Sequence, residues 1–217
     1  MLLILLTTVT GVVDAVSYIA LGHVFVANMT GNVVFLAFAL AGAPGLSVPA
    51  SIAALAAFLL GAVAGGRIVS RYPTHRGRQL RTATAIAVVP VLLAVAIAAI
   101  VGQPVSGGTR YALIVPLGVA MGIQNATARR LAVPDLKTTV LTLTLTGVAA
   151  DSRLAGGPGG QPLRRLISVG AMFVGAIVGA FFVVEVDLVI PLAIAAVLLA
   201  ACALIAHRRS IGKPSWA

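Results

Sequence analysis

The chain has 217 residues, of which 60% are hydrophobic and only 9% are charged. A soluble domain carries about 25% charged residues, so a water-soluble fold of this composition would expose large apolar surfaces and aggregate. The net charge of +10 does not indicate nucleic-acid binding, because the basic residues form short clusters between apolar runs. The sequence therefore predicts one all-α integral membrane domain over residues 1–217, a polytopic helix bundle in a lipid bilayer.

Six apolar segments are long enough to cross about 30 Å of hydrocarbon as helices. They cover residues 1–21, 48–70, 82–101, 110–128, 165–185 and 187–206. The first has no basic flank before it, so we expect a retained span and not a cleaved signal peptide. Segments 24–42 and 138–150 contain more polar residues, and the second would reach only about 20 Å as a helix. We expect these two to be short or re-entrant.

The positions of the 15 Lys and Arg residues predict the orientation. If neither short segment crosses, fourteen lie on one side and only Arg110 on the other, which puts both termini in the cytoplasm. If both cross, the split is seven against eight, which is no bias. A version with seven spans, in which 24–42 crosses and the N-terminus is outside, gives the same fourteen-to-one count. We expect a plasma-membrane protein with a cytoplasmic C-terminus and anionic lipid headgroups beside the Arg clusters.

Two motifs occur once in each half of the chain. Gly11-x-x-Asp14 resembles Gly122-x-x-Asn125, 111 residues later, and Gly61-x-x-x-Gly65 resembles Gly175-x-x-x-Gly179, 114 residues later. This pattern indicates repeat halves over about 1–105 and 106–210. Because each half holds three full spans, the halves would be inverted, an arrangement known among transporters.

Part of the sequence resembles a known family. The runs Gly11–Tyr18 and Leu21–Asn32 resemble the signature of the YoaK family of small bacterial multi-pass membrane proteins, and Gly122–Ala126 resembles its second motif. Members of that family commonly have a Thr-Gly pair near 142–143, where this chain reads Thr142-Leu143 and places the pair at Thr146-Gly147. The resemblance implies a bacterial plasma-membrane protein and supplies no activity.

Asp14 is the polar residue that the bilayer should make most costly. A carboxylate within a span costs about 2.5–3.5 kcal/mol on insertion scales, so it is expected to face the bundle interior. Ser17 and Tyr18 follow at i+3 and i+4 and are expected on the same face. The cluster indicates a proton relay or an ion site, or else a structural Asp bonded to a neighbouring helix or an unwound segment.

Asn28, Thr30, Gly31 and Asn32 form a second candidate site. Gly favours a helix break, and amide and hydroxyl groups can bond the freed backbone, so a substrate or ion could meet exposed carbonyls and a helix N-terminus here. The alternative is a polar helix start near the interface, capped by Asn28 or Thr30.

Gln124 and Asn125 end the fourth span, and the repeat makes Asn125 the counterpart of Asp14. The two would face each other across a pseudo-two-fold axis, or Gln124 and Asn125 would only hydrogen-bond between helices. Thr139 and Thr142 of the second short segment could line a polar path.

The sequence has no phosphate-binding loop, no Cys/His cluster and no hydrolase motif, so we expect neither an enzyme nor a cofactor. The favoured hypothesis is a transporter or permease of a small solute or ion, proton-coupled through Asp14. The alternative is a non-transporting membrane scaffold or accessory subunit. Either could form a homo-oligomer.

Overall fold

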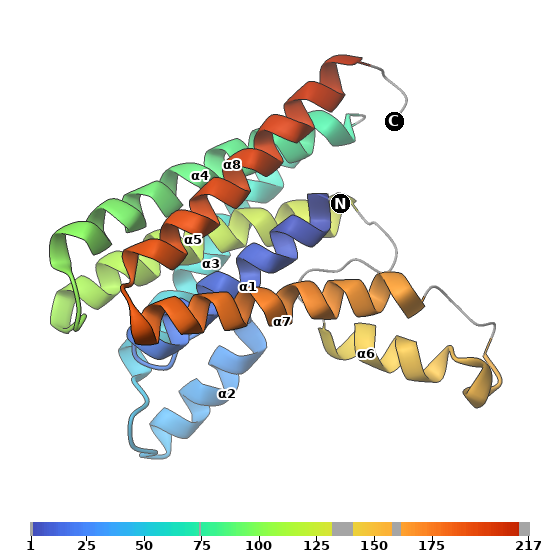
Figure 1. Cartoon of the computed structure of the whole chain (residues 1–217). Helices are drawn as coiled ribbons and strands as arrows, with labels where there is room; N and C mark the ends of the chain where they lie inside the picture. Colours follow the sequence, from blue (N-terminus) through green and yellow to red (C-terminus); the bar gives the residue numbers. More distant parts are fainter. Residues whose placement is uncertain (1, 74, 132–140, 158–161, 213–217) are drawn as a thin grey trace.

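The computed structural model describes residues 2–73, 75–131, 141–157 and 162–212, and these form an all-helical bundle (Figure 1). Its six long helices are α1 (Leu2–Ala20), α3 (Val48–Ser70), α4 (Arg76–Val101), α5 (Gly107–Leu131), α7 (Pro162–Glu185) and α8 (Val189–Gly212). Each is long and apolar enough to cross a membrane, which confirms the prediction of six spans. Helix α4 begins before the predicted apolar run, because a helix can continue beyond the hydrocarbon with charged side chains.

Two short helices lie beside the spans: α2 (Met29–Leu40) and α6 (Leu141–Ala150), the latter followed by a single 3-10 turn at Arg153–Ala155. The 12 residues of α2 reach only about 18 Å, so α2 is too short to be a seventh span. Helix α2 packs against α3, and α6 packs against α7. The first residues of the segment predicted at 138–150 lie outside the described residues.

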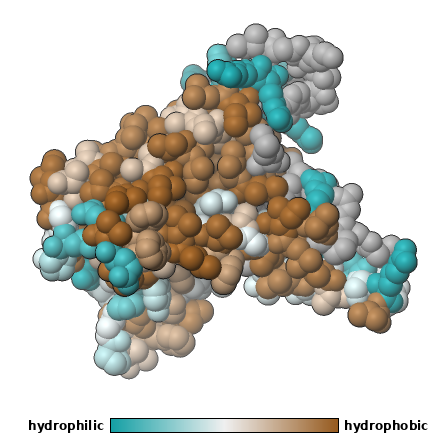
Figure 2. All heavy atoms as spheres, viewed as in Figure 1, coloured by the Kyte–Doolittle hydropathy of each residue, from teal (hydrophilic) through white to brown (hydrophobic). Residues whose placement is uncertain are grey.

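The bundle has two distinct ends. At one end α1 stops, α5 begins and α7 turns into α8; we call it the Arg-poor end, because Arg110 is the one Lys or Arg described there. At the opposite end, the Arg-rich end, α3 turns into α4 and the other described Lys and Arg residues gather. Figure 2 shows hydrophilic residues at the ends and a hydrophobic surface between them. This distribution matches a bilayer around the middle of the bundle.

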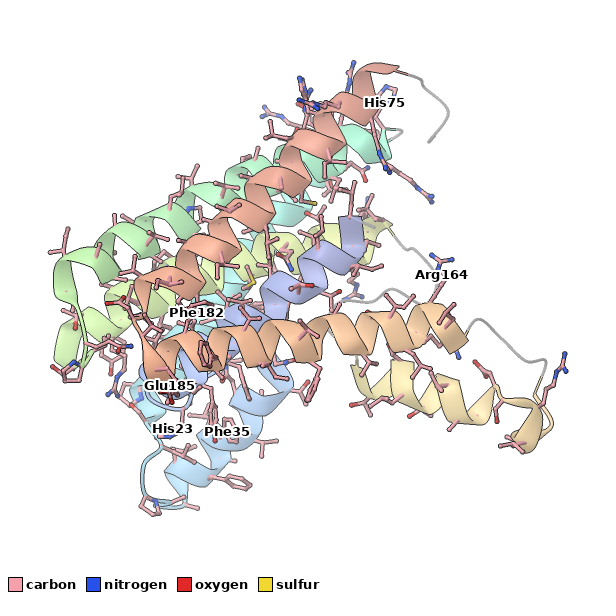
Figure 3. The ribbon with its side chains drawn as sticks, viewed as in Figure 1. His23, Phe35, His75, Arg164, Phe182 and Glu185 are labelled. Carbon is pink, nitrogen blue, oxygen red and sulfur yellow. The ribbon has the colours of Figure 1, made fainter. Side chains whose placement is uncertain are left out.

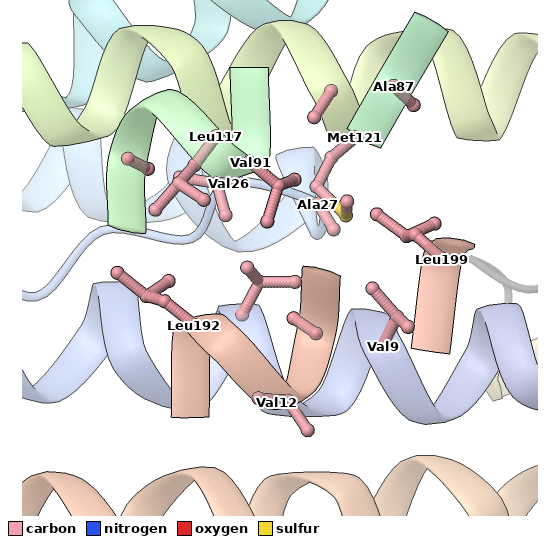
Figure 4. Packing of buried hydrophobic residues seen from close by; sticks show 14 of the residues in the cluster. Val9, Val12, Val26, Ala27, Ala87, Val91, Leu117, Met121, Leu192 and Leu199 are labelled. Atoms are coloured by element: carbon pink, nitrogen blue, oxygen red, sulfur yellow. The ribbon is translucent and has the colours of Figure 1, made fainter. Parts of the chain in front are cut away.

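Helices α1 and α5 form the centre of the bundle, since they carry the most buried residues. Their side chains join those of α4 and α8 in one apolar cluster, part of which is shown in Figure 4. Val26 and Ala27, from the segment between α1 and α2, belong to the same cluster although they are not helical. Irregular backbone is therefore part of the core.

Helices α1 and α7 approach each other at glycines. Gly11 of α1 lies on the carbonyl of Met172, and Gly175 of α7 lies on the carbonyl of Thr8, so neither glycine has room for a Cβ atom. One turn further along α7, a Cβ on Gly179 would come within 2.7 Å of the Val12 carbonyl oxygen. Small residues at such positions allow the two backbones to pack closely.

Helices α5 and α3 make the same set of contacts. Gly122 lies on the carbonyl of Phe58, Gly61 lies on the carbonyl of Val119, and a Cβ on Gly65 would come within 2.8 Å of the Ile123 carbonyl oxygen. Each α5 residue in these contacts lies 111 positions after its α1 counterpart, as Gly122 does after Gly11. Each α3 residue lies 114 positions before its α7 counterpart, as Gly61 does before Gly175. The helix pairs α1–α7 and α5–α3 are thus related by the same two offsets that separate the sequence motifs.

Candidate functional site

The segment after α1 turns back into the bundle. Gly22 (φ 90°) and His23 (φ 57°) both adopt left-handed backbone conformations, and the His23 N–H donates to the Tyr18 carbonyl. This bond and the glycine end the helix in the manner of a Schellman motif. The chain then runs inward through the buried residues Val26 and Ala27 before α2 begins at Met29. Residues 21–28, which we call the re-entrant loop, are non-helical and lie beside a membrane span.

Asp14 holds the inner part of the re-entrant loop. Its Oδ1 accepts hydrogen bonds from the backbone N–H groups of Val26 (3.1 Å) and Ala27 (2.9 Å), and its Oδ2 accepts one from the Asn28 side-chain amide (2.9 Å). Asp14 is only 3% exposed and lies six residues before the end of α1, or about 9 Å along the helix. The carboxylate therefore satisfies two buried backbone donors and one half-buried side-chain amide.

Asn28 and Asn32 complete this arrangement. Asn28 occupies the N-cap position of α2, but its side chain makes no capping bond and donates to Asp14. Asn32 is fully buried; its Oδ1 accepts from the Phe25 N–H (2.8 Å), and its amide donates to the Phe25 carbonyl. The predicted capping role is therefore replaced by side-chain bonds that fix the loop. We call Asp14, Asn28 and Asn32 the Asp14 cluster.

The other residues predicted around this site lie at its edge. Ser17 is buried, and its hydroxyl donates to the Asp14 main-chain carbonyl. A Cβ on Gly31 would lie 2.7 Å from the Phe25 ring, so this glycine makes room for the aromatic ring. Tyr18 is 36% exposed and stacks on Phe25, with ring centroids 5.2 Å apart. Thr30, at the start of α2, is exposed.

Gln124 links the two central helices at a second polar position. Its amide nitrogen donates to the Leu6 carbonyl oxygen and to the Thr10 Oγ1, both at 3.0 Å and both on α1. Its Oε1 is buried and has no hydrogen-bond partner among the described residues. Asn125 donates to the Met121 carbonyl of its own helix. Within the described chain, the hydrogen bonds of the Asp14 carboxylate all go to the re-entrant loop, and none joins it to Asn125.

Replacing Gln124 with methionine is expected to change the free energy of unfolding by less than about 1 kcal/mol. The substitution removes the unpartnered Oε1, and the Thr10 hydroxyl still donates to the Leu6 carbonyl oxygen at 3.0 Å. The unfolding midpoint in detergent measures the effect. A fall equivalent to about 3 kcal/mol would contradict the expectation and show that the Oε1 has a partner such as a bound water.

The threonines of the second short segment are only partly described. Thr142 is exposed on α6, whereas Thr144 is 7% exposed and makes a polar contact. The Asp151–Arg165 ion pair, 2.5 Å long, joins the end of α6 to α7. Thr139 lies outside the described residues. Of the two predicted threonines, the described one does not face the Asp14 cluster.

The structure adds residues that the sequence interpretation missed. Thr7 and Thr10 are buried on α1, and their hydroxyls donate to the carbonyls of Leu3 and Leu6. With Asp14 and Ser17 they form a buried polar stripe at spacings of three and four residues, a signal that was visible in the sequence. Across the described ranges, no group of three His, Cys, Asp or Glu side chains is placed to hold a metal ion.

Comparison with known proteins places the chain among membrane proteins. A family described as "Protein of unknown function (DUF1275)" matches residues 2–205. A Bacillus subtilis (strain 168) protein described as "UPF0700 transmembrane protein YoaK" is 34% identical over 155 residues, which cover 69% of this chain and 65% of that protein. No solved structure matches. The resemblance based on the motifs around Asp14 and Asn28–Asn32 is confirmed.

Proposed function

This chain belongs to the DUF1275 family of multi-pass membrane proteins, and on that premise we propose that it is a transporter or permease of a small solute or ion. One observation carries the proposal: an irregular, re-entrant loop is held beside a span by the carboxylate of Asp14. Non-helical backbone at membrane depth occurs only where protein buries it or where it lines a water-filled cavity. Broken segments of this kind form the central sites of many transporters.

The paired helices support a mechanism of alternating access. The contacts of α1–α7 recur in α5–α3 at constant offsets, as expected for inverted halves over about 1–105 and 106–210. Glycine contacts make each pair a closely packed unit, so movement between the pairs would disturb fewer contacts than movement within them. Rocking of one pair against the other would open the centre alternately to each side.

Asp14 is the proposed point of proton coupling. As a carboxylate it accepts three hydrogen bonds from the loop and Asn28. A proton on Oδ2 would leave Oδ1 free to accept from Val26 and Ala27 but would weaken the bond from the Asn28 amide, because a hydroxyl oxygen is a poorer acceptor than a carboxylate oxygen. Protonation would therefore release part of the re-entrant loop and could accompany uptake of the solute.

The placement of charge supports the orientation and the partners we propose. The Arg-rich end would face the cytoplasm, with both termini on that side of a plasma membrane and anionic headgroups beside the arginines. A homo-oligomer is compatible with this placement. We propose no enzymatic activity, no cofactor and no nucleic-acid partner.

A scaffold or accessory subunit is the second candidate, and the Asp14 cluster itself favours it. Asp14, Asn28 and Asn32 direct their hydrogen bonds at one another and at the loop backbone. In a scaffold these bonds would only stabilise an unusual turn. The two functions differ in whether water reaches the loop.

Accessibility of single cysteines to a water-soluble, membrane-impermeant thiol reagent tests the transport proposal. In a Cys202→Ala background, we expect Asn28→Cys and Thr30→Cys to be labelled from one side of the membrane. Labelling should change with pH or with a transported solute, because the loop would be released and re-formed. Ser17→Cys and Thr142→Cys report on the buried stripe and on α6.

Two controls make this experiment decisive. Leu59→Cys lies on the lipid-facing surface of α3 and should stay unlabelled, while Leu154→Cys is fully exposed at the Arg-rich end and should react. If both controls give these results and the loop cysteines remain unlabelled at every pH, water does not reach the re-entrant loop. That result would reject transport and support the scaffold.

A further inference from the structure

Arg110 differs from the other basic residues in its position. It lies in the first turn of α5 at the Arg-poor end, whereas the other described Lys and Arg residues are at or near the Arg-rich end. Figure 3 shows His23 of the re-entrant loop, Phe35 of α2 and Glu185 of α7 at the Arg-poor end as well. A single arginine here has no part in the charge bias that orients a membrane protein.

The Arg110 side chain packs on the outer turn of the re-entrant loop. Gly22 adopts φ 90°, and a Cβ on this glycine would lie 2.6 Å from Arg110 Nη1 and 2.9 Å from Cζ. The guanidinium thus occupies the space that a side chain at Gly22 would need. The re-entrant loop is contacted by Arg110 at its outer turn and by Asp14 at its inner part.

One buried donor of Arg110 lacks an acceptor within the described part of the chain. Its Nε is buried and has no hydrogen-bond partner among the described residues. The acids at this end do not neutralise it: Asp187 accepts from the Val189 N–H, and neither Asp187 nor Glu185 forms an ion pair with Arg110. A buried donor on a charged group normally has a partner, so its absence here points to a missing acceptor.

The surroundings favour an oxyanion as that acceptor. A guanidinium presents parallel N–H groups that match the two oxygens of a carboxylate or phosphate. Arg110 also lies in the first turn of α5, a helix of 25 residues, where the positive end of the helix dipole favours an anion. Both features attract the same kind of group.

We propose that Arg110 binds an oxyanion, either a carboxylate or a phosphate, at the Arg-poor end of the bundle. We further infer that this anion is the transported solute, which rests on the proposed transport function. An anion bound to the guanidinium would lie next to the outer turn of the re-entrant loop. Asp14 holds the inner part of the same loop. The oxyanion can come from two sources: a small soluble anion or the headgroup of a phospholipid.

Thermal unfolding of the purified full chain in a neutral detergent tests the proposal. The buried Cys202 reacts with a thiol-reactive fluorophore only when the bundle opens, so it reports the unfolding midpoint. Sodium phosphate and sodium succinate are the probes, compared with sodium chloride at equal ionic strength. At ten times the dissociation constant, a bound oxyanion should raise the midpoint by about 3–6 °C.

Variants assign the effect to the site. Arg110→Gln should lose the shift, and Arg110→Lys should keep a smaller one, because lysine retains the charge without the fork of donors. Arg71→Gln removes an exposed positive charge at the Arg-rich end and should respond as the native chain does. No oxyanion shift in the native chain, or an undiminished shift in Arg110→Gln, would overturn the proposal. If Arg110→Gln does not fold, an undiminished shift in Arg110→Lys would overturn recognition by the fork.

Lipid composition separates the two sources. In nanodiscs of phosphatidylcholine, a soluble substrate anion should still raise the midpoint. A midpoint raised by phosphatidylglycerol, with no response to phosphate or succinate, would support the oxyanion site but assign it to a lipid headgroup and reject the soluble substrate. If the anion binds but the loop cysteines are not labelled, the oxyanion site is supported and transport is rejected. If the loop cysteines are labelled but no anion binds, transport is supported and the oxyanion site is rejected.

Discussion

Replacing Asp14 with alanine is expected to lower the free energy of unfolding by about 3 kcal/mol or more. The substitution leaves the backbone N–H groups of Val26 and Ala27 and the side-chain amide of Asn28 without their acceptor. A buried donor without a partner costs about 1–3 kcal/mol, and the surrounding core offers no replacement. The Cys202 assay in detergent should show a midpoint about 6–12 °C lower.

A graded series tests whether the carboxylate has this role. Asp14→Asn should cause a smaller loss, because its amide oxygen can still accept from the Val26 and Ala27 N–H groups while its nitrogen faces the Asn28 amide. Glu185→Gln removes the same charge from the bundle surface and should leave the midpoint unchanged. An Asp14→Ala chain that unfolds at the native midpoint would show that the carboxylate does not hold the loop.

Leucine at Gly65 or Gly179 is expected to separate a helix pair and to cost about 3 kcal/mol or more. A Cβ at Gly65 would lie 2.8 Å from the Ile123 carbonyl oxygen, and a Cβ at Gly179 would lie 2.7 Å from the Val12 carbonyl oxygen. Because both obstacles are helix backbone, the larger side chain cannot be accommodated by a change of rotamer. The unfolding midpoint of each purified variant measures the loss.

The same helices provide matched controls. Gly66 in α3 and Gly170 in α7 have no atom within 4 Å of an added Cβ, so leucine at either should be tolerated. Similar losses at Gly65 and Gly179 are expected, since these residues occupy equivalent places in the two pairs. A large loss at one and none at the other would contradict the equivalence of α5–α3 and α1–α7, and would weaken the case for inverted halves.

Several features of this protein could be predicted from the sequence because they depend on local composition. A helix advances about 1.5 Å per residue, so apolar length alone identified the six long segments and showed that 138–150 was too short to cross. The close-packed helix faces also have a sequence signal in the spacing of Gly61 with Gly65 and of Gly175 with Gly179, because small residues four apart lie on one side of a helix. Asp14 was identified as buried because a carboxylate in lipid is costly.

The tertiary structure alone decided what each polar side chain contacts. Asn28 binds Asp14, fourteen residues away, and leaves α2 uncapped by its side chain; Gln124 reaches Thr10, 114 residues away. Tyr18 stacks on Phe25 near the surface, although its spacing put it on the face of Asp14. Helical spacing gives the face of one helix, whereas these partners depend on the path of a non-helical loop and on which helices become neighbours. Hydrogen-bond partners follow from that three-dimensional arrangement, which no single stretch of sequence contains.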